Sequence, residues 1–219
     1  MLALLKRDFL LYFRNRSGVF FSLLGALISF LLYIIFLQKN LMDAWSQLPD
    51  NKSLLNNWLM GGTLAVTGIT TSFTALTQMV QDRENQVDQD LFLTDLGSWG
   101  LQVSYLISSI IISFVMQVFM FAVMSLYFRE SPVISYLPEI TLIMLLSSLL
   151  SSVVNILLIY RFQSVDSLGK LATIVGTASG FLVGTYIPIG VLPDFAQIIM
   201  KCTPATYIAS LYRQVLMKD

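Results

Sequence analysis

The sequence predicts an all-α membrane protein with an N-terminal interfacial amphipathic helix, five transmembrane helices and then two short re-entrant helices. Hydrophobic residues make up 56% of the 219 residues and charged residues only 12%, about half the charged share usual in soluble domains. The mean hydropathy is +0.74. The few charges lie in short stretches between long apolar runs, as a bilayer requires, because a charge at its centre costs about 2.5–3.5 kcal/mol.

The first element, residues 1–18, is predicted to be a basic amphipathic helix. Four apolar residues recur at helical spacing and four cations lie elsewhere on the helix: Leu2, Leu5, Phe9 and Phe13, and Lys6, Arg7, Arg14 and Arg16. A helix of this kind lies in the membrane interface with its cations toward anionic headgroups. An ordinary cytoplasmic tail is the alternative.

The transmembrane domain is expected over residues 19–187. Its first segment, residues 19–37, contains no charged residue and, at about 1.5 Å per residue, is long enough to cross the hydrocarbon core. Four further apolar segments are expected to span the membrane: residues 58–80, 101–128, 140–160 and 171–187. The 58–80 segment is unusually rich in glycine and threonine. Polar connections separate the spans, and the connection at 81–97 is the most charged.

Residues 188–219 are predicted to form two short re-entrant or interfacial helices on the extracellular side. Pro188, Gly190, Pro193 and Pro204 interrupt this apolar region, so it never reaches a full span. Backbone groups freed by proline are tolerated at membrane depth only where protein or water covers them. A soluble tail is the alternative, and the large apolar residues of this region argue against it.

The distribution of lysine and arginine predicts a cytoplasmic N-terminus. Residues 1–18, 81–97 and 161–170 are expected on one side of the membrane and carry seven of these cations, against three on the other side. By the positive-inside rule, the side with seven faces the cytoplasm. The chain is therefore expected to be a multi-pass protein of the cell (plasma) membrane with the 81–97 loop inside the cell.

The residue types that are absent exclude most enzyme classes. There is no histidine and a single cysteine, Cys202, which excludes an intramolecular disulfide and argues against a metal site. Gly169 and Lys170 are followed by Leu171 and lack the upstream glycine of a P-loop, so the sequence has no such loop for ATP. No catalytic residue and no bound cofactor are expected, and a net charge of zero removes the simple case for nucleic acid. A transporter subunit or a membrane scaffold remains.

Two stretches of the sequence resemble a known family. They are QDRENQVDQDLFLTDLGSWGLQVSYLISSII, residues 81–111, and GTASGFLVGTYIPIGVLPDFAQIIMKCTPATYIASLYRQVLM, residues 176–217. These stretches and the order of elements resemble the membrane-spanning subunits of type-2 ATP-binding-cassette (ABC) export permeases, in particular Gram-positive-like multidrug and peptide exporters. The chain departs from the family pattern at Gln86, where a small residue is usual, and near Leu96 and Gly97, where a proline is usual. The sixth span that follows the re-entrant pair in the family is absent from this chain.

The resemblance implies that the 81–97 loop holds a coupling helix that docks on a separate ABC ATPase subunit, which carries the ATP and Mg²⁺. The implied contact residues combine charges with an apolar anchor, and Glu84 is the foremost candidate among them: Asp82, Arg83, Glu84, Asp88, Asp90, Leu91 and Phe92. A merely solvated loop is the alternative. The resemblance also implies a homodimer or heterodimer with a second permease, surrounded by membrane lipid.

Three further sets of residues are candidates for packing, gating and transport. A stripe of small residues with four-residue spacing allows close helix approach, either at a dimer seam or within the subunit: Ala172, Gly176, Gly180 and Gly184. The external gate implied by the family includes Tyr186, Pro188, Pro193, Pro204, Tyr207 and Arg213. Polar residues inside the spans are candidates for a substrate path, with helix-to-helix hydrogen bonding as the alternative: Thr67, Thr71, Gln117 and Asn155.

The function predicted on this basis is that of the permease subunit of an ABC exporter. It would move an amphiphilic drug, peptide, lipid or glycan outward, using ATP hydrolysed by the separate subunit. Multidrug efflux is one form that such transport takes in the family. A non-transporting membrane scaffold or sensor that binds a cytoplasmic partner is the alternative.

Overall fold

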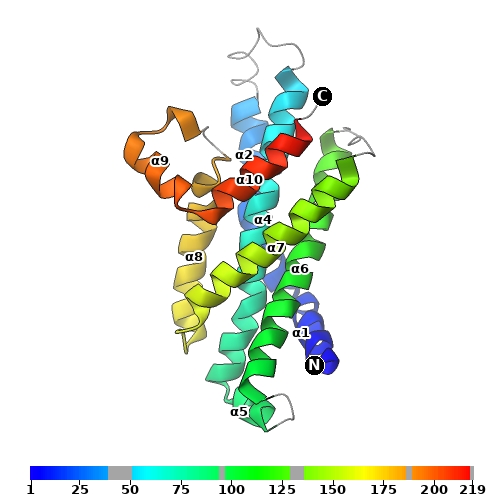
Figure 1. Ribbon diagram of the computed structural model, residues 1–219, viewed down its shortest axis with the longest axis vertical. Helices are drawn as coiled ribbons and strands as arrows, with labels where there is room; N and C mark the ends of the chain where they lie inside the picture. The colour runs from blue at the N-terminus through cyan, green and yellow to red at the C-terminus, as the bar shows by residue number, and fades with distance from the viewer. Residues whose placement is uncertain (39–50, 94–96, 129–135, 186–188, 218–219) are drawn as a thin grey trace.

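The computed structural model describes residues 1–38, 51–93, 97–128, 136–185 and 189–217, and over these residues it contains helices and no strand (Figure 1). The prediction of an all-helical chain is therefore confirmed for the described part. The helices in chain order are α1 (Leu2–Arg14), α2 (Arg16–Leu32) with its π-helical continuation η1 (Tyr33–Leu37), α4 (Asn51–Glu84), α5 (Val87–Phe92), α6 (Gly97–Phe128), α7 (Leu137–Ile159), α8 (Val165–Leu182), the short η3 (Ile189–Val191), α9 (Asp194–Lys201) and α10 (Pro204–Leu216).

Four helices of the described chain are long and apolar enough to cross a membrane. They are Arg16–Phe36, Lys52–Glu84, Gly97–Phe128 and Leu137–Ile159, and they correspond to the first four predicted spans, the first and fourth of which end one residue beyond the helix. The fifth predicted span, residues 171–187, does not meet this standard. It corresponds to α8, which begins at Val165 and ends at Leu182, so its first turns carry Asp166 and Lys170 and its purely apolar part is short.

Helix α4 forms the centre of the bundle and packs against α2, α6, α7, α8 and α10 (Figure 1). Its apolar window is 83% buried, against 33–44% for the other three spans. The glycines of its sequence permit this close packing. A Cβ at Gly68 would lie 2.8 Å from Ser147 Oγ of α7, and a Cβ at Gly62 would lie 2.6 Å from Thr185 Oγ1.

The N-terminal helix is shorter than predicted. Helix α1 ends at Arg14, and Asn15 then caps α2 by accepting a 3.0 Å hydrogen bond from the backbone N–H of Gly18. The predicted apolar stripe is exposed or half-buried, with Leu2 83% exposed. A different face of α1 is buried against the bundle. It carries Asp8, with Leu4 one turn before it and Tyr12 one turn after it.

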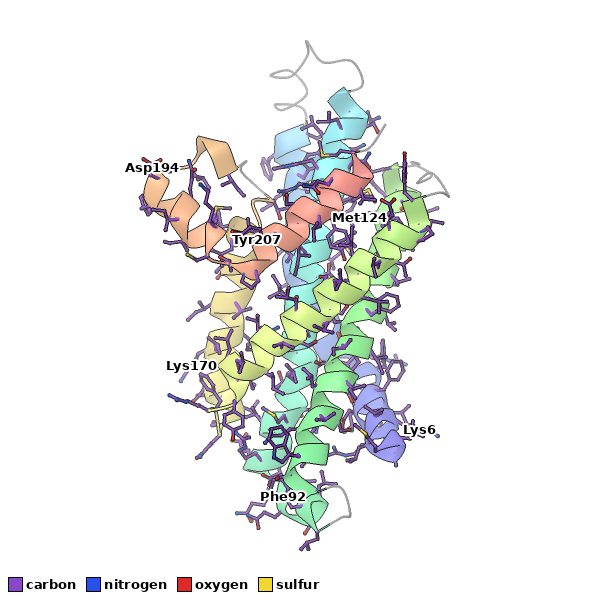
Figure 2. All side chains as sticks on the ribbon, in the orientation of Figure 1. Lys6, Phe92, Met124, Lys170, Asp194 and Tyr207 are labelled. Atoms are coloured by element: carbon purple, nitrogen blue, oxygen red, sulfur yellow. The ribbon has the colours of Figure 1, made fainter. Side chains whose placement is uncertain are left out.

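The region after α8 forms two short helices, as the prolines predicted. Pro193 precedes α9, and Pro204 occupies the first turn of α10, where its missing N–H is not needed. Lys6 and Phe92 lie at one end of the molecule and Asp194 and Tyr207 toward the other (Figure 2). We call these the α5 end and the α10 end. Whether α9 and α10 re-enter a membrane stays a prediction.

Candidate functional site

The C-terminal end of α4 is the point where most elements of the α5 end meet. Asp82 there is 3% exposed. Its carboxylate accepts hydrogen bonds from Arg7 of α1, at 2.8 Å from Nη1 and 2.6 Å from Nη2, and from the Tyr105 hydroxyl of α6 at 2.5 Å. Gln78 Nε2 donates a further bond of 2.8 Å. The fork of the guanidinium on both carboxylate oxygens fixes the direction of the pair as well as its strength.

A second buried carboxylate adjoins this ion pair. Arg7 Nη1 also donates a 3.1 Å hydrogen bond to Asp8, and Ser108 Oγ of α6 donates one of 3.2 Å to the other Asp8 oxygen. Burial raises the pKa of Asp8 to about 6, although the Arg7 guanidinium opposes the rise. The hydrogen bond to Asp82 raises the pKa of Arg7 above its ordinary value. One cation therefore serves two carboxylates.

Arg83 and Glu84, the next two residues of α4, hold the turn between α7 and α8. Arg83 Nη1 donates to the carbonyl oxygens of Tyr160, at 2.8 Å, and Phe162, at 2.9 Å. Glu84 Oε2 accepts a 3.0 Å hydrogen bond from the backbone N–H of Val165. A carboxylate in that position satisfies a free N–H at the start of α8 and suits the positive end of the helix dipole.

Asp82, Arg83 and Glu84 therefore contact α1, α6, α7 and α8 together, and we call these three residues the α4 junction. All three were predicted as ATPase contacts, and that role stays a prediction. Their side chains make contacts inside the chain, and Asp82 is the most deeply buried. The pairing of Asp82 with Arg7 was not predicted, because the two residues lie 75 positions apart in the chain.

Helix α5 leaves the α4 junction through Gln86, whose φ of 60° lies in the left-handed region. Of the other predicted contact residues, Asp88 and Leu91 are half-buried, and Leu91 packs on the apolar cluster that includes Leu76 and Val80. Asp90 and Phe92 are exposed.

Two exposed apolar residues that were not predicted lie beside Phe92 in the sequence and at the start of α6. Leu93 is 87% exposed and Trp99 is 81% exposed, while Phe92 is 43% exposed. With Asp90 they form what we call the α5 tip: Asp90, Phe92, Leu93 and Trp99. The signal in the sequence is the presence of large apolar residues inside a connection that is otherwise polar.

The predicted substrate-path residues are hydrogen-bonded inside the protein. Gln117, fully buried in α6, accepts a 2.6 Å bond from the Tyr212 hydroxyl of α10 and donates one of 2.8 Å to Ser148 Oγ of α7. Asn155 of α7 donates to two groups of α4, the carbonyl oxygen of Ile69 at 2.9 Å and Ser72 Oγ at 2.8 Å. The alternative of helix-to-helix hydrogen bonding thus accounts for both amides.

The two threonines of the same set bond to their own helix. Thr67 donates to Thr63 O at 2.8 Å, and Thr71 donates to Thr67 O at 2.6 Å. A role of any of the four residues in a substrate path stays a prediction.

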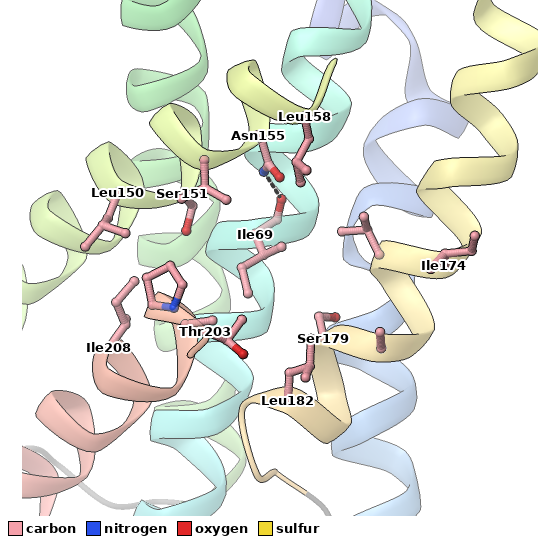
Figure 3. Close-up of a pocket in the computed structure, with 15 residues that line it drawn as sticks. Ile69, Leu150, Ser151, Asn155, Leu158, Ile174, Ser179, Leu182, Thr203 and Ile208 are labelled. Carbon is pink, nitrogen blue, oxygen red and sulfur yellow. Dashed lines mark hydrogen bonds between the residues drawn. The ribbon is translucent and has the colours of Figure 1, made fainter. Parts of the chain in front are cut away.

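Asn155 also borders an apolar cavity of about 240 Å³ between α4, α7, α8 and the start of α10. Figure 3 shows Asn155 directed at Ile69 across one wall, with Ser179 and Leu182 of α8 on the other side. No charged residue is found among the described residues that line it. The Ser151 hydroxyl at its wall is buried and has no hydrogen-bond partner in the described part of the chain. The cavity suits an apolar group.

The small-residue stripe of α8 divides between two environments. Ala172 and Gly176 line a second cavity, of about 460 Å³, between α2, α4 and α8. A Cβ at Gly176 would meet no described atom within 4 Å. Gly180 and Gly184 are buried. Gly184 lies two residues after the end of α8, with a φ of 67° in the left-handed region. Packing within the subunit accounts for the last two glycines, while a dimer seam at the first two residues stays a prediction.

Arg213 is the best-connected of the predicted gate residues. Its Nη2 donates to Gly184 O at 2.9 Å and its Nε to Trp58 O at 3.3 Å, and its guanidinium carbon lies 4.6 Å from the centre of the Trp58 ring. It thus ties α10 to the end of α8 and to α4. Tyr207 is exposed and donates to Lys201 O at 2.7 Å.

Tyr186 and Pro188 lie outside the described residues. Pro193 directly precedes α9, and Pro204 is the first residue of α10. The gate role of the whole set stays a prediction.

A family model described as ABC-2 type transporter matches residues 1–217. Neither the curated proteins nor the solved structures contain a match.

Proposed function

Because the chain belongs to the ABC-2 type transporter family, we propose that it is the permease subunit of an exporter that moves an amphiphilic molecule outward. It is a multi-pass membrane permease domain without catalytic activity of its own, and the family implies an ATPase partner. ATP would be hydrolysed by that partner, and the permease would convert the resulting movement into a change of access across the membrane.

The exposed α5 tip is the observation that carries this proposal. Phe92 at the end of α5, Leu93 directly after it and Trp99 in the first turn of α6 are exposed apolar residues outside the predicted spans. Large exposed apolar groups next to a charge are typical of protein–protein interfaces, in which aromatic residues supply most of the binding energy. We infer that an ATPase covers the α5 tip, with Asp90 at the edge of the contact.

The path from the tip into the membrane supports the same function. Helix α4 is continuous over 34 residues, about 50 Å at 1.5 Å per residue. A displacement of α5 is expected to displace the α4 junction as well, because only Asn85 and Gln86 separate α5 from the end of α4. A rigid central helix that packs against most other helices of the described chain then transmits the displacement as a rigid-body rearrangement of the bundle.

The substrate class rests on the two cavities. Both lie among the span helices and are lined mainly by apolar side chains with hydroxyls and one amide among them. Such a lining favours a molecule with an apolar body and a few hydrogen-bonding groups. Amphiphilic drugs, peptides, lipids and glycans, the substrate classes predicted from the sequence, include molecules of this description.

Membrane sidedness provides the decisive test. Gln89 is exposed on α5 and Cys202 is exposed on the linker after α9. A Gln89→Cys, Cys202→Ser chain is labelled with a membrane-impermeant maleimide in inside-out and in right-side-out vesicles. We expect labelling of residue 89 only in inside-out vesicles. Labelling in right-side-out vesicles would reject the proposal, because an ATPase supplied with cytoplasmic ATP could not reach α5.

A second measurement separates an exporter from a scaffold that only binds the ATPase. The chain and the ATPase are reconstituted together in proteoliposomes with a fluorescent amphiphilic dye. An exporter moves the dye when ATP is added, whereas a scaffold retains the complex without transport.

A further inference from the structure

Helix α1 is attached to the rest of the protein mainly at three points. Leu4 packs on the apolar cluster of α4 and α6, Arg7 and Asp8 bond to Asp82 and Ser108, and the Tyr12 hydroxyl lies 2.7 Å from Ser22 Oγ of α2. With 13 residues, α1 would be only marginally stable as an isolated helix. Its place therefore depends on these contacts.

The Arg7–Asp82 pair is the most directional of the three attachments. The exposed fractions of the two side chains are 29% and 4%. Asp82 receives four hydrogen bonds, two from Arg7 and one each from Tyr105 and Gln78. If Arg7 moved away, Asp82 would be left as a buried charge without its cation, which is strongly unfavourable. Asp82 and Arg7 are thus expected to move together.

The position of Asp82 gives this pair a mechanical consequence. It lies two residues before the end of α4, and α5 begins at Val87. A displacement of α5 therefore displaces Asp82 and, through it, Arg7 and α1. Helix α1 in turn is joined to α2 through the single residue Asn15, whose side chain caps α2. A movement at α5 can thus reach the span α2 as well as the span α4.

We propose that α1 is a moving part of the coupling unit and that Arg7 is the positioning residue that ties it to the end of α4. The proposal rests on the proposed function, in which an ATPase displaces α5. It assigns α1 a role beyond membrane anchoring, because one contact at α5 then drives two spans at the same time. Tyr105 and Ser108 of α6 provide the surface along which the α1–α4 unit rests.

Distances between spin labels test whether α1 and α5 move as one unit. The complex with its ATPase is studied in lipid nanodiscs, in a Cys202→Ser chain that carries pairs of labels. The label sites are exposed on α1, on α5 and at the far end of α6: Leu10, Gln89 and Leu126, each changed to Cys. The nucleotide state is changed by adding ATP with vanadate.

In the otherwise unchanged chain, the distance from residue 89 to residue 126 is expected to shift with nucleotide, while that from residue 10 to residue 89 stays fixed. With Arg7→Ala, the first distance is expected to shift as before, but the second is expected to lose its fixed value and to change with nucleotide. The Arg7→Ala complex is expected to keep its ATPase rate, which would show that the variant is folded and bound to the ATPase. Lys6→Ala, which removes the same charge from an exposed neighbour on α1, is expected to behave as the unchanged chain.

Two results would overturn the proposal. One is a change of the 10–89 distance with nucleotide in the unchanged chain, and the other is an Arg7→Ala chain that keeps this distance fixed. If Arg7→Ala does not fold, Arg7→Lys takes its place, because one ammonium cannot hold both carboxylate oxygens as the guanidinium fork does. The exchanged pair Arg7→Asp with Asp82→Arg is expected to restore the fixed distance.

Failure of the proposed function has a different signature in the same experiment. It would appear as an 89–126 distance that does not respond to nucleotide in the unchanged chain. In that case α5 is not driven at all, and the inference about α1 falls with it.

Discussion

The hydroxyl of Tyr212 in α10 lies 2.6 Å from Oε1 of Gln117 in α6 and donates a hydrogen bond to it. The two residues are 95 positions apart in the chain, and each is fully buried. Through Gln117 the bond continues to Ser148 of α7 at 2.8 Å. Helix α10 is therefore held in the bundle by a polar contact in its middle, in addition to its apolar face.

The first prediction concerns this contact. Tyr212→Phe leaves the Gln117 oxygen without this donor and is expected to lower the free energy of unfolding in detergent by about 1 kcal/mol, since such bonds between membrane helices average about 0.6 kcal/mol and reach about 1.7 kcal/mol. Tyr207→Phe is the matched control, because that ring is exposed and its hydroxyl bonds to the last residue of α9. Equal effects of the two changes would show that the Gln117 bond adds nothing.

Arg213 is predicted to protect α10 against local unfolding. Arg213→Ala removes the donors to Gly184 O and Trp58 O and the ring contact with Trp58. Hydrogen bonds to charged groups contribute about 1.5–3 kcal/mol each, so amide hydrogen exchange in α10 is expected to be at least about tenfold faster.

Arg213→Lys keeps the charge but not the fork and is expected to give an intermediate exchange rate. Unaltered exchange in α10 in both variants would contradict the assigned role. The measurement is hydrogen–deuterium exchange with mass spectrometry on the purified chain.

Asp8 is predicted to make stability depend on pH. Its pKa is about 6 in the folded protein and 3.8 in the ordinary reference state, so between these values the folded chain binds more protons than the unfolded chain. The free energy of unfolding is therefore expected to fall as pH rises from about 4 to about 6 and to level off above that. Protonation of Asp8 stabilises the fold because it removes a buried negative charge.

Asp8→Asn should remove this dependence. At pH 7.5 the variant is expected to unfold with a free energy up to about 3 kcal/mol higher, at about 1.4 kcal/mol per pKa unit, and the difference should shrink toward pH 4.5. Denaturation in detergent across this range measures it, with the exposed Asp90→Asn as control. A difference that is constant with pH would refute the assignment to Asp8.

Replacement by alanine is predicted to affect stability differently at Gly68 of α4 and at Gly176 of α8. Gly68→Ala places a Cβ 2.8 Å from Ser147 Oγ and 3.2 Å from Gln117 Nε2, and overpacking of this kind destabilises by about 1–3 kcal/mol. Gly176→Ala meets no described atom within 4 Å and is expected to leave the monomer equally stable or slightly more stable, because alanine favours the helix.

A larger residue at Gly176 tests the dimer seam. If α8 packs on a second permease at this face, Gly176→Leu should weaken self-association in size-exclusion chromatography while the monomer remains folded. Unchanged association would assign the stripe to packing within the subunit alone.

Trp99 is predicted to be a principal contact for the ATPase. It is 81% exposed in the chain, so Trp99→Ala should leave folding unchanged. Aromatic residues at interface centres contribute about 2 kcal/mol or more, so the affinity for the ATPase is expected to fall about thirtyfold in a binding titration. Leu126→Ala, an equally exposed position at the other end of α6, is the control and should have no effect.

The choice of helices and their approximate ends could be predicted from the sequence. Crossing a membrane depends on the summed hydrophobicity of about 20 consecutive residues, and this is a local property. The first four spans, the charged connection and the proline-broken region after residue 188 were recognised for this reason. The fifth segment was placed less well, because Asp166 and Lys170 begin a helix that the apolar run alone does not reveal.

The pairing of side chains was decided only by the tertiary structure. Asp82 was predicted as a contact residue of the charged loop, but in the structure its side chain is buried and paired with Arg7, 75 residues away. The exposed residues are instead Leu93, directly after α5, and Trp99, in the first turn of α6. Likewise, the partners of Gln117 and Asn155 on other helices could not be read from the sequence, and a role of these residues in a substrate path stays a prediction. Composition determines that a helix lies in the membrane, whereas its rotation and its neighbours depend on how all the helices pack together, and that information is not local.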